Sequence, residues 1–291
     1  MKNSNDQYPE LEFFGSGPSP ATFSIVAGSF DSHYGWSNET GFTVSEGGAV
    51  TPAAPSLRTR PSRLTVAAPD GNGAWTLNLT TLSATTVSFI DGQGSTHTAT
   101  LPSGPQLSSA GPNPATIQSY AAGCNQTIWL AIVDNSGNST LYWLGAASGF
   151  KAVAVSLPDD GAVQHQGVQS LSVAIVGDHL CYYRHFDSQA QGYTNYFGCI
   201  APAGSVTEKP DAWESPSVYL VTGPDGNAWG INDASGDTGN ATILRLDADA
   251  DSSQFNLPGF YASQGFSDLV SSDGYFWWCD GSFKLWKMTV S

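Results

Sequence analysis

The stretch from Val218 to Asn232, VYLVTGPDGNAWGIN, has the pattern of a β-hairpin. A short apolar run leads into Pro224–Asn227, and a second apolar run carries Trp229. Asp-Gly between two apolar runs is a strong hairpin signal, because primed turns need positive φ and glycine adopts it without a steric penalty. We therefore predict two antiparallel strands joined by a primed turn, with a large aromatic side chain on the second strand.

The same design recurs along the chain. The further stretches of this kind are Phe23–Asn38, Leu64–Asn78, Ser119–Ile132, Leu171–His185 and Asp268–Asp280. A second marker is a proline that closes each unit, roughly 50 residues apart, at Pro52, Pro102, Pro158, Pro210 and Pro258. A repeat of strands alone at this length, with one Gly/Asp turn and one aromatic per unit, is typical of a β-propeller blade.

We predict an all-β, six-bladed β-propeller that forms a single domain. The blades are expected at residues 15–52, 53–102, 103–158, 159–210, 211–258 and 259–291. The last unit is one strand short, and Leu11–Phe14 has no place in the first. We expect Leu11–Phe14 to supply the missing outer strand and close the ring, because closure removes an exposed sheet edge. The repeated aromatics are expected in the core between blades, at Trp75, Trp129, Trp229 and Trp277.

Composition limits the classes of partner. Ten Lys and Arg stand against 25 Asp and Glu, which gives a formal net charge of −15. This acidity argues against nucleic acid and against anionic membrane surfaces, and no apolar run is long enough to insert in a membrane.

The start, Met1–Glu10, lacks the apolar core of a signal peptide. Glycosylation sequons nevertheless favour secretion over a cytoplasmic location; they begin at Asn38, Asn78, Asn125, Asn138 and Asn240.

Neither the cysteines nor the acidic residues predict a metal site, and we expect no cofactor. The cysteines form no CxxC pair that would suggest zinc; they are Cys124, Cys181, Cys199 and Cys279. Cys181 and Cys199 flank one predicted hairpin, and we favour free buried thiols over a disulfide between them.

Asp247–Asp251 begins like a calcium loop, but Ser252 and Pro258 occupy the positions that need Gly and Glu. We interpret it as a solvated acidic turn.

Candidate ligand-binding residues lie at the end of the propeller where the inner strands begin. Four polar residues are expected at or near these strand starts, namely Arg63, Gln118, Gln169 and Asp268. Arg63 and Asp268 would hold a polar ligand between them or form a buried ion pair that satisfies itself. Three aromatic residues are expected in nearby loops, namely Tyr193, Trp213 and Tyr261. Their flat faces suit sugars or other ring-shaped ligands, and the alternative is packing against the blade rim.

Two histidines are candidate general bases. His33 and His185 each have an Asp and aromatic residues within two positions, and a histidine beside a carboxylate is able to move protons near neutral pH. Asp268 is the candidate carboxylate for the same chemistry. The alternative is that these histidines are loop or surface residues, because neighbouring residues of a strand point to opposite faces and adjacency in sequence does not bring them together. A long hairpin loop is expected separately at Phe186–Asn195.

Two propeller families share features with the chain. Thr222–Trp229, TGPDGNAW, resembles the repeat of the seven-bladed virginiamycin B lyase family, and Pro69–Trp75 is a partial copy. That family uses His and Glu with magnesium, but no Glu here follows a PDGNxW turn, so we carry over no catalytic residue. Blade length and Ser172–Phe186 are similar to the six-bladed fungal fucose-type lectins. Those lectins bind sugar through a repeated Arg, Glu and Trp, whereas the arginines here do not recur at one blade position.

The leading functional prediction is a lectin-like propeller that binds a glycan or a small ring-shaped ligand in an axial or inter-blade pocket. The alternative is a cofactor-free lyase or cyclase with a single substrate pocket at the axis. A third hypothesis is a protein-interaction scaffold. The blades differ from one another, which favours one asymmetric site over several repeated ones.

Overall fold

The structure is a computed structural model. It describes residues 8–16, 22–30, 36–45, 50–52, 63–78, 83–84, 86–102, 115–133, 139–158, 170–188, 192–211, 218–232, 240–261, 269–272, 274–279 and 285–289. Within these ranges the chain is all-β, with one short 3-10 helix, η2 (Ala146–Ser148). The all-β prediction is therefore confirmed.

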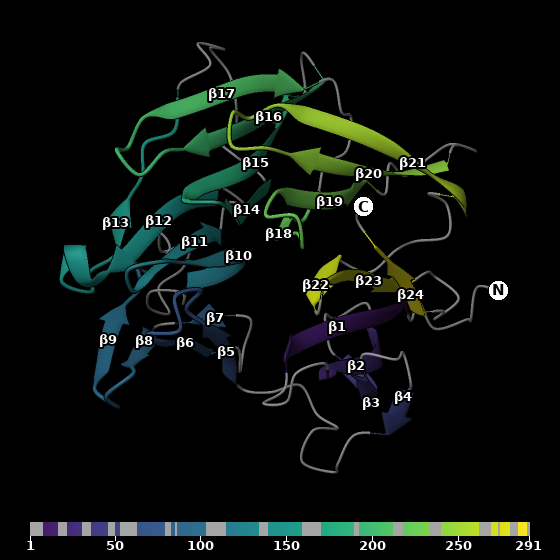
Figure 1. Cartoon of the computed structure of the whole chain (residues 1–291), viewed down its shortest axis with the longest axis horizontal. Helices are drawn as coiled ribbons and strands as arrows, with labels where there is room; N and C mark the ends of the chain where they lie inside the picture. Colours follow the sequence, from purple (N-terminus) through teal and green to yellow (C-terminus); the bar gives the residue numbers. More distant parts are fainter. Residues whose placement is uncertain are drawn as a thin grey trace, which may run out of the picture.

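The strands form separate antiparallel sheets that follow one another along the chain (Figure 1). The first two sheets have the orders β1 (Tyr8–Ser16), β2 (Thr22–Phe30), β3 (Trp36–Ser45), β4 (Val50–Pro52) and β5 (Arg63–Ala67), β6 (Gly73–Asn78), β8 (Thr86–Asp91), β9 (Thr96–Thr100). The third has the order β13 (Val153–Ala154), β12 (Ser139–Gly145), β11 (Thr127–Val133), β10 (Ala115–Gly123), β7 (Ser83–Ala84). The fourth and fifth have the orders β14 (Ser170–Val176), β15 (His179–Ser188), β16 (Gly192–Ile200), β17 (Val206–Asp211) and β18 (Val221–Thr222), β19 (Ala228–Asn232), β20 (Asn240–Leu246), β21 (Ser252–Tyr261). The last has the order β22 (Val270–Ser272), β23 (Tyr275–Cys279), β24 (Leu285–Met288). Several four-stranded antiparallel sheets in sequence are what propeller blades require.

The N-terminal strand belongs to the first sheet. β1 pairs with β2, with Leu11 opposite Ala27 and Phe13 opposite Ile25. No described residue of β1 pairs with the last sheet. The predicted closure through Leu11–Phe14 is therefore wrong, and the first unit starts before residue 15. A local hairpin with β2 closes a much shorter loop than a pairing across the whole chain, so it costs less chain entropy.

The hairpin at Val218–Asn232 forms as β18 and β19, but its turn is of a different type. The Gly223 N–H donates to the Asn227 carbonyl at 2.7 Å, and the Gly226 N–H donates to the Gly223 carbonyl at 3.0 Å. Gly226, with φ 78°, is the turn residue in the left-handed region. This is a type I turn followed by a left-handed glycine, so the primed-turn prediction is wrong here.

The aspartate of this turn fixes the aromatic side chain of the next strand. Asp225 accepts hydrogen bonds from Trp229 Nε1 at 2.8 Å and from Arg245 Nε at 3.0 Å. Partial burial raises the pKa of Asp225, but hydrogen bonds from Trp229, Asn227 and Arg245 outweigh it and hold that pKa below its usual value. The PDGNxW pattern is thus a structural device that orients Trp229.

Hydroxyl side chains connect the inner strands of neighbouring sheets. Ser119 Oγ accepts the Val173 N–H at 3.1 Å, and Ser172 Oγ accepts the Leu220 N–H at 2.6 Å. The inner strands β10, β14, β18 and β22 lie beside one another in turn (Figure 1). β14, β18 and β22 are sheet edges, and β10 pairs with β7 only through Ala115 and Thr116. These bonds therefore satisfy backbone groups that would otherwise lack partners.

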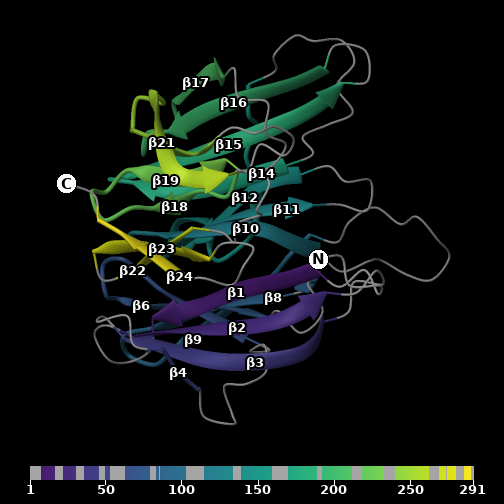
Figure 2. The same ribbon diagram turned by 90° about the vertical axis from the view of Figure 1, so that its right-hand side faces the viewer.

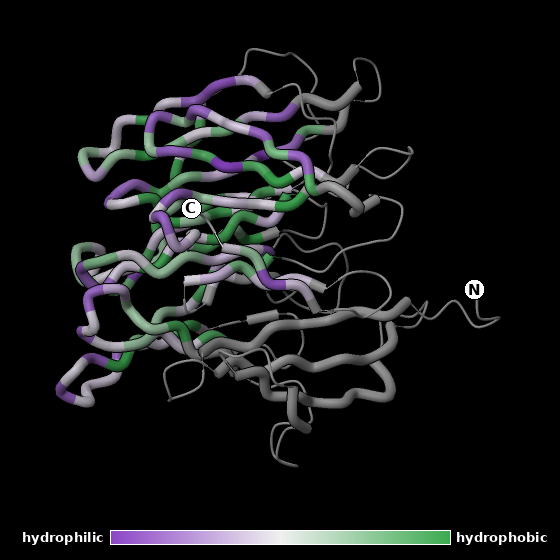
Figure 3. Tube along the Cα trace, turned by 45° about the vertical axis from the view of Figure 1, so that its right-hand side comes forward, coloured by the Kyte–Doolittle hydropathy of each residue, from purple (hydrophilic) through white to green (hydrophobic). Residues whose placement is uncertain are grey.

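The hydrophobic core lies between successive sheets. One cluster joins the second and third sheets, and others join the third to the fourth, the fourth to the fifth and the fifth to the last. Trp75, Trp229 and Trp277 are buried, which confirms their predicted place in the core, whereas Trp129 is half-buried. Figure 3 shows hydrophobic segments in the interior and more hydrophilic ones on the outer strands and turns.

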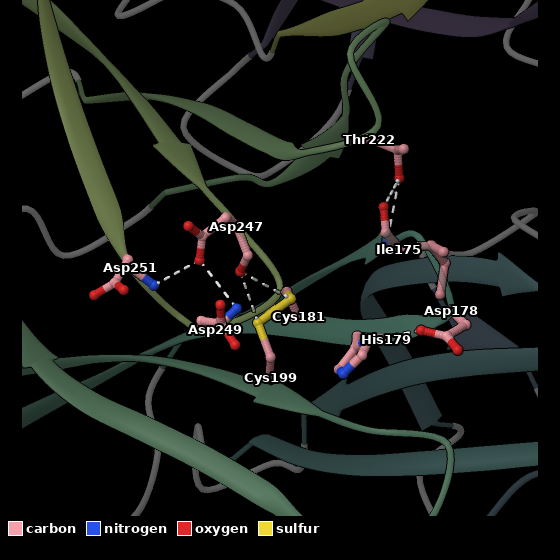
Figure 4. The surroundings of a disulfide bond; sticks show 9 residues. All are labelled: Ile175, Asp178, His179, Cys181, Cys199, Thr222, Asp247, Asp249 and Asp251. Carbon is pink, nitrogen blue, oxygen red and sulfur yellow. Dashed lines mark hydrogen bonds and ion pairs between the residues drawn. A yellow bond between two sulfur atoms is a disulfide. The ribbon is translucent and has the colours of Figure 1, made fainter.

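Cys181 and Cys199 form a disulfide, so the preference for free thiols is wrong. They lie directly opposite each other on β15 and β16, with Cα atoms 4.0 Å apart. Their sulfur atoms lie 3.7 and 3.2 Å from the carbonyl oxygen of Asp247 (Figure 4). A disulfide sulfur carries no hydrogen, so these are packing contacts rather than hydrogen bonds.

Candidate functional site

β15 carries two clusters of buried polar side chains, one on each of its faces. Successive side chains of a strand point to opposite faces of the sheet. Cys181 and Tyr183 pack in the cluster shared with the fifth sheet, whereas Leu180 and Tyr182 pack in the cluster shared with the third. By this alternation His185 faces the fifth sheet and Arg184 faces the third.

His185 and Asn195 form a buried pair near the end of the fourth sheet. His185 lies opposite Ser170 of β14 on one side and Asn195 of β16 on the other. His185 Nδ1 is 2.6 Å from Asn195 Oδ1, and both residues are 1% exposed. Because a carbonyl oxygen only accepts, Nδ1 is the donor in this hydrogen bond.

The structure corrects the environment expected for His185. β15 continues to Ser188 and β16 begins at Gly192. The long loop predicted at Phe186–Asn195 is therefore mostly strand, and the loop-or-surface interpretation of His185 is wrong.

The amide nitrogen of Asn195 is the least satisfied part of this pair. Asn195 Nδ2 is buried and has no hydrogen-bond partner among the residues that the structure describes. Leaving a buried polar donor unpaired costs about 1–3 kcal/mol. Such a group is either a local defect or a donor kept for a ligand.

At one end of the fourth sheet β14 begins and β15 turns back into β16, opposite the hairpin turn between β14 and β15 (Figure 2). The pair lies at this end, because His185 is opposite Ser170, the first residue of β14. The disulfide marks the other end of the same two strands (Figure 4). His185 therefore lies at the end of the molecule where the sequence placed the ligand.

The cluster on the opposite face is an ionic network in which the buried charges are paired, although Arg184 Nε is buried without a described partner. Arg184 Nη2 donates to Glu208 of β17 and, at 2.8 Å, to the Pro158 carbonyl. Tyr182 Oη donates to the second oxygen of Glu208 at 2.5 Å. The Arg184 guanidinium also lies 4.9 Å from the ring centroids of both Phe186 and Tyr196. The charge is therefore compensated within the protein.

Tyr182 reaches Glu208 across a glycine. Gly198 stands between them in the sheet, and a Cβ at that position would overlap the Tyr182 ring. Burial, together with the hydrogen bond to Glu208, raises the pKa of the Tyr182 phenol well above its usual value. Tyr182 consequently acts as a neutral donor.

Gln118 has a structural contact and a free donor. Its Oε1 accepts the Ser139 hydroxyl at 2.7 Å and the Leu171 N–H at 3.0 Å, so it bridges β12 and β14. Its Nε2 bonds to no described residue. Gln118 is thus near the start of its inner strand, as predicted, with one donor available to a ligand.

The remaining predicted site residues are placed only in part. Arg63 is the first residue of β5, opposite Asn78. Tyr193 and Tyr261 lie in β16 and β21 rather than in loops, so their loop assignment is wrong. The others lie outside the described residues, and these are His33, Gln169, Trp213 and Asp268.

The acidic turn at Asp247–Asp251 is organised by its own side chain. Asp247 Oδ1 accepts the N–H groups of Asp249 and Asp251 at 3.0 and 2.9 Å. Across the described ranges, no three His, Cys, Asp or Glu side chains gather in a way that would hold a metal ion. Of the helical segments described, none has the length and apolarity to cross a membrane.

Sequence reasoning missed Asn195 and the network around Arg184. Asn195 was assigned to the end of a loop. A usable signal was present, because the register that places Cys181 opposite Cys199 also places His185 opposite Asn195.

Comparisons with known proteins identify the fold. No protein-family model and no curated sequence matches the chain. Among solved structures, a catalytically inactive virginiamycin B lyase from Staphylococcus aureus with quinupristin is 12% identical, with a TM-score of 0.52, over 100% of this chain and 97% of that one. A protein of unknown function from Dyadobacter fermentans DSM 18053 is 10% identical, with a TM-score of 0.53, over 99% of this chain and 95% of that one. A mutant Aleuria aurantia lectin in complex with alpha-methyl-L-fucoside is 10% identical, with a TM-score of 0.47, over 97% of this chain and 90% of that one. This structural similarity shows that the chain has a β-propeller fold.

Proposed function

We propose that this propeller binds a glycan or a small ring-shaped ligand in a pocket between the fourth and fifth sheets, at the end where the inner strands begin. His185 and Asn195 contribute the polar wall of this pocket. The ring has six blades in this proposal, which the grouping of the described strands supports.

The unpaired amide of Asn195 is the observation that carries the proposal. A buried amide that donates no hydrogen bond destabilises the free protein, and an oxygen-rich ligand would remove that cost by accepting from Nδ2. The hydroxyl and ring oxygens of a sugar are acceptors of this kind, and the net charge of −15 makes an anionic ligand unfavourable. We further propose that nucleic acids and membranes are not partners.

Native mass spectrometry with a panel of neutral glycans and a small-molecule extract tests the proposal. We expect one ligand per chain. Asn195→Leu and His185→Gln should each weaken binding at least tenfold, which corresponds to about 1.4 kcal/mol. His179→Gln is the matched control, because His179 is a half-buried histidine at the other end of the same strand. Equal loss in the control, or several equal sites per chain, would contradict the single-pocket proposal.

The second candidate function is a cofactor-free lyase or cyclase. The orientation of His185 favours it, because the hydrogen bond from Nδ1 to Asn195 Oδ1 fixes the imidazole ring, and an oriented imidazole is a common general base. In this case the bound molecule changes in mass with time in the wild-type protein. The change should stop in His185→Gln even at ligand concentrations high enough to saturate the weakened binding of this variant. Binding without any change in mass supports the binding protein alone.

A further inference from the structure

The hairpin turn between β10 and β11 carries a sequon whose asparagine is free to react. Asn125-Gln126-Thr127 forms this turn, and Asn125 is exposed. The Asn125 N–H donates to Asp70 Oδ2 at 3.1 Å, and the Thr127 hydroxyl donates to the Asn125 carbonyl at 3.4 Å. These bonds hold the backbone, whereas no described residue bonds to the Asn125 carboxamide.

The backbone of the turn also presents this side chain outward. Asn125 and Gln126 both have φ 57°, the combination that a primed turn needs. The other sequons differ in setting. Asn38, Asn78 and Asn240 lie on strands β3, β6 and β20, and Asn138 is outside the described residues. Asn125 is therefore the sequon asparagine that the structure places at an exposed turn.

The disulfide supplies an independent indication of the compartment. Cys181 and Cys199 are 0% and 1% exposed and are joined across two paired strands. Structural disulfides form in oxidising environments such as the secretory pathway, and cytosolic proteins rarely keep them. N-linked glycans are added in the same pathway, to asparagines of Asn-X-Ser/Thr on the surface.

We propose that Asn125 is an N-glycosylation site and that the protein matures in an oxidising secretory compartment. The carboxamide nitrogen attacks the anomeric carbon of a lipid-pyrophosphate-linked oligosaccharide. The bond from that carbon to the pyrophosphate oxygen breaks, the lipid pyrophosphate leaves, and the nitrogen loses one proton to solvent. An oligosaccharyltransferase of the host catalyses the step.

The position of the glycan follows from the topology. The β10–β11 turn follows the last residue of β10, so it lies at the end of its sheet opposite the start of that strand (Figure 2). A glycan on Asn125 would cover this turn and the neighbouring turn at Asp70, and it would leave the end with His185 and Asn195 open. The modification is therefore compatible with ligand binding and does not depend on it.

Secreted expression of the full chain in a glycosylating eukaryotic cell tests the proposal. The purified protein is treated with peptide N-glycosidase in heavy-oxygen water and mapped by mass spectrometry. We expect the Asn125 peptide to carry a labelled aspartate and the intact protein to lose the mass of one glycan at this site. An unmodified Asn125 peptide in the folded, secreted protein would overturn the proposal.

Two variants separate the sequon from general effects on the turn. Thr127→Ser keeps the sequon and should keep the glycan, whereas Thr127→Val has nearly the same shape and should lose it. Retention of the modification in Thr127→Val would show that the mass is not an N-linked glycan. If Cys181 and Cys199 were found reduced in protein purified from its natural source, the proposed maturation in an oxidising compartment would be wrong.

Discussion

The two faces of β15 differ in the buried polar groups that they hold: one face holds a paired charge, and the other holds two side chains that share a hydrogen bond. Towards the third sheet, the Glu208 carboxylate accepts from both Arg184 and Tyr182, so the buried charges are paired, although Arg184 Nε has no described partner. Towards the fifth sheet, His185 and Asn195 share one hydrogen bond and leave an amide nitrogen without a described partner. The two clusters are one residue apart in sequence.

The difference follows from charge. An ion without a partner in the interior is too costly to keep, so Arg184 requires Glu208 within the fold. A neutral amide without a partner costs only about 1–3 kcal/mol. A fold is able to carry that cost when a ligand supplies the missing acceptor. We call the face of β15 with Arg184, Tyr182 and Glu208 the closed face, and the face with His185 and Asn195 the open face. The closed face is expected to control stability, and the open face is expected to control binding.

The largest expected effect is the loss of the carboxylate on the closed face. Glu208→Gln leaves the Arg184 guanidinium buried without its counter-charge, and breaking a buried pair in this way costs about 3–5 kcal/mol. Urea denaturation of the purified variant measures the change in the free energy of unfolding.

A double variant distinguishes the ion pair from simple packing. Arg184→Met with Glu208→Leu removes both charges and should recover most of the stability, because apolar side chains often replace buried ion pairs at little cost. If the double variant is no more stable than Glu208→Gln, the coupling between Arg184 and Glu208 is absent and the comparison fails.

The second effect concerns the disulfide, which lies on the open face but at the other end of it. Cys181→Ala with Cys199→Ala should lower the free energy of unfolding by roughly 2–4 kcal/mol, because the cross-link restricts the unfolded chain. Cys124→Ser is the control: Cys124 is exposed and free, so its change should stay within about 0.5 kcal/mol. Equal denaturation midpoints for the double variant and the wild type would refute a structural role for this bond.

The sequence predicted an all-β chain of successive sheets but not the details of strand pairing. Turn residues and aromatic positions identified the blade-like sheets, because these signals are local. The partner of β1 was not predictable in this way, since Leu11–Phe14 has the pattern of a strand whichever sheet it joins. No sequence signal indicated that the hydroxyl groups of Ser119 and Ser172 bond to the next sheet.

The candidate site was predictable to the extent that strand register was known. His185 was identified from the residues next to it in the sequence. The prediction of its partner, Asn195, would have required knowing how far β15 and β16 extend. Pairing Cys181 with Cys199 would have fixed that register, because each further step along one strand moves one step back along the other. Glu208 lies on a third strand, and the sequence contains no marker for its distance from Arg184.

The third expected effect is a loss, at alkaline pH, of the contribution that Tyr182 makes to the free energy of unfolding. The pKa of Tyr182 is raised in the folded protein by burial and by Glu208. Its stabilising contribution is therefore fully present below the pKa of the unfolded tyrosine, about 10, and is lost as the pH rises above it. Tyr182→Phe should cost about 2 kcal/mol at pH 7, because it removes a hydrogen bond to a charged group. The difference between the two proteins should shrink in urea denaturation as the pH rises past 10, and a constant difference would contradict the raised pKa.

The smallest expected effect on stability is on the open face, and it is the sharpest test of the comparison. Asn195→Leu removes a buried donor that has no described partner, which is stabilising, but it also removes the acceptor of His185 Nδ1, which is destabilising. Each contribution is about 1–3 kcal/mol, so the two should offset and leave the free energy of unfolding within about 1 kcal/mol of wild type. Urea denaturation measures this beside the native mass spectrometry of ligand binding. A loss of stability as large as that of Glu208→Gln would mean that Asn195 is a structural anchor. The two faces of β15 would then not differ in role, because the open face would hold the fold together as the closed face does.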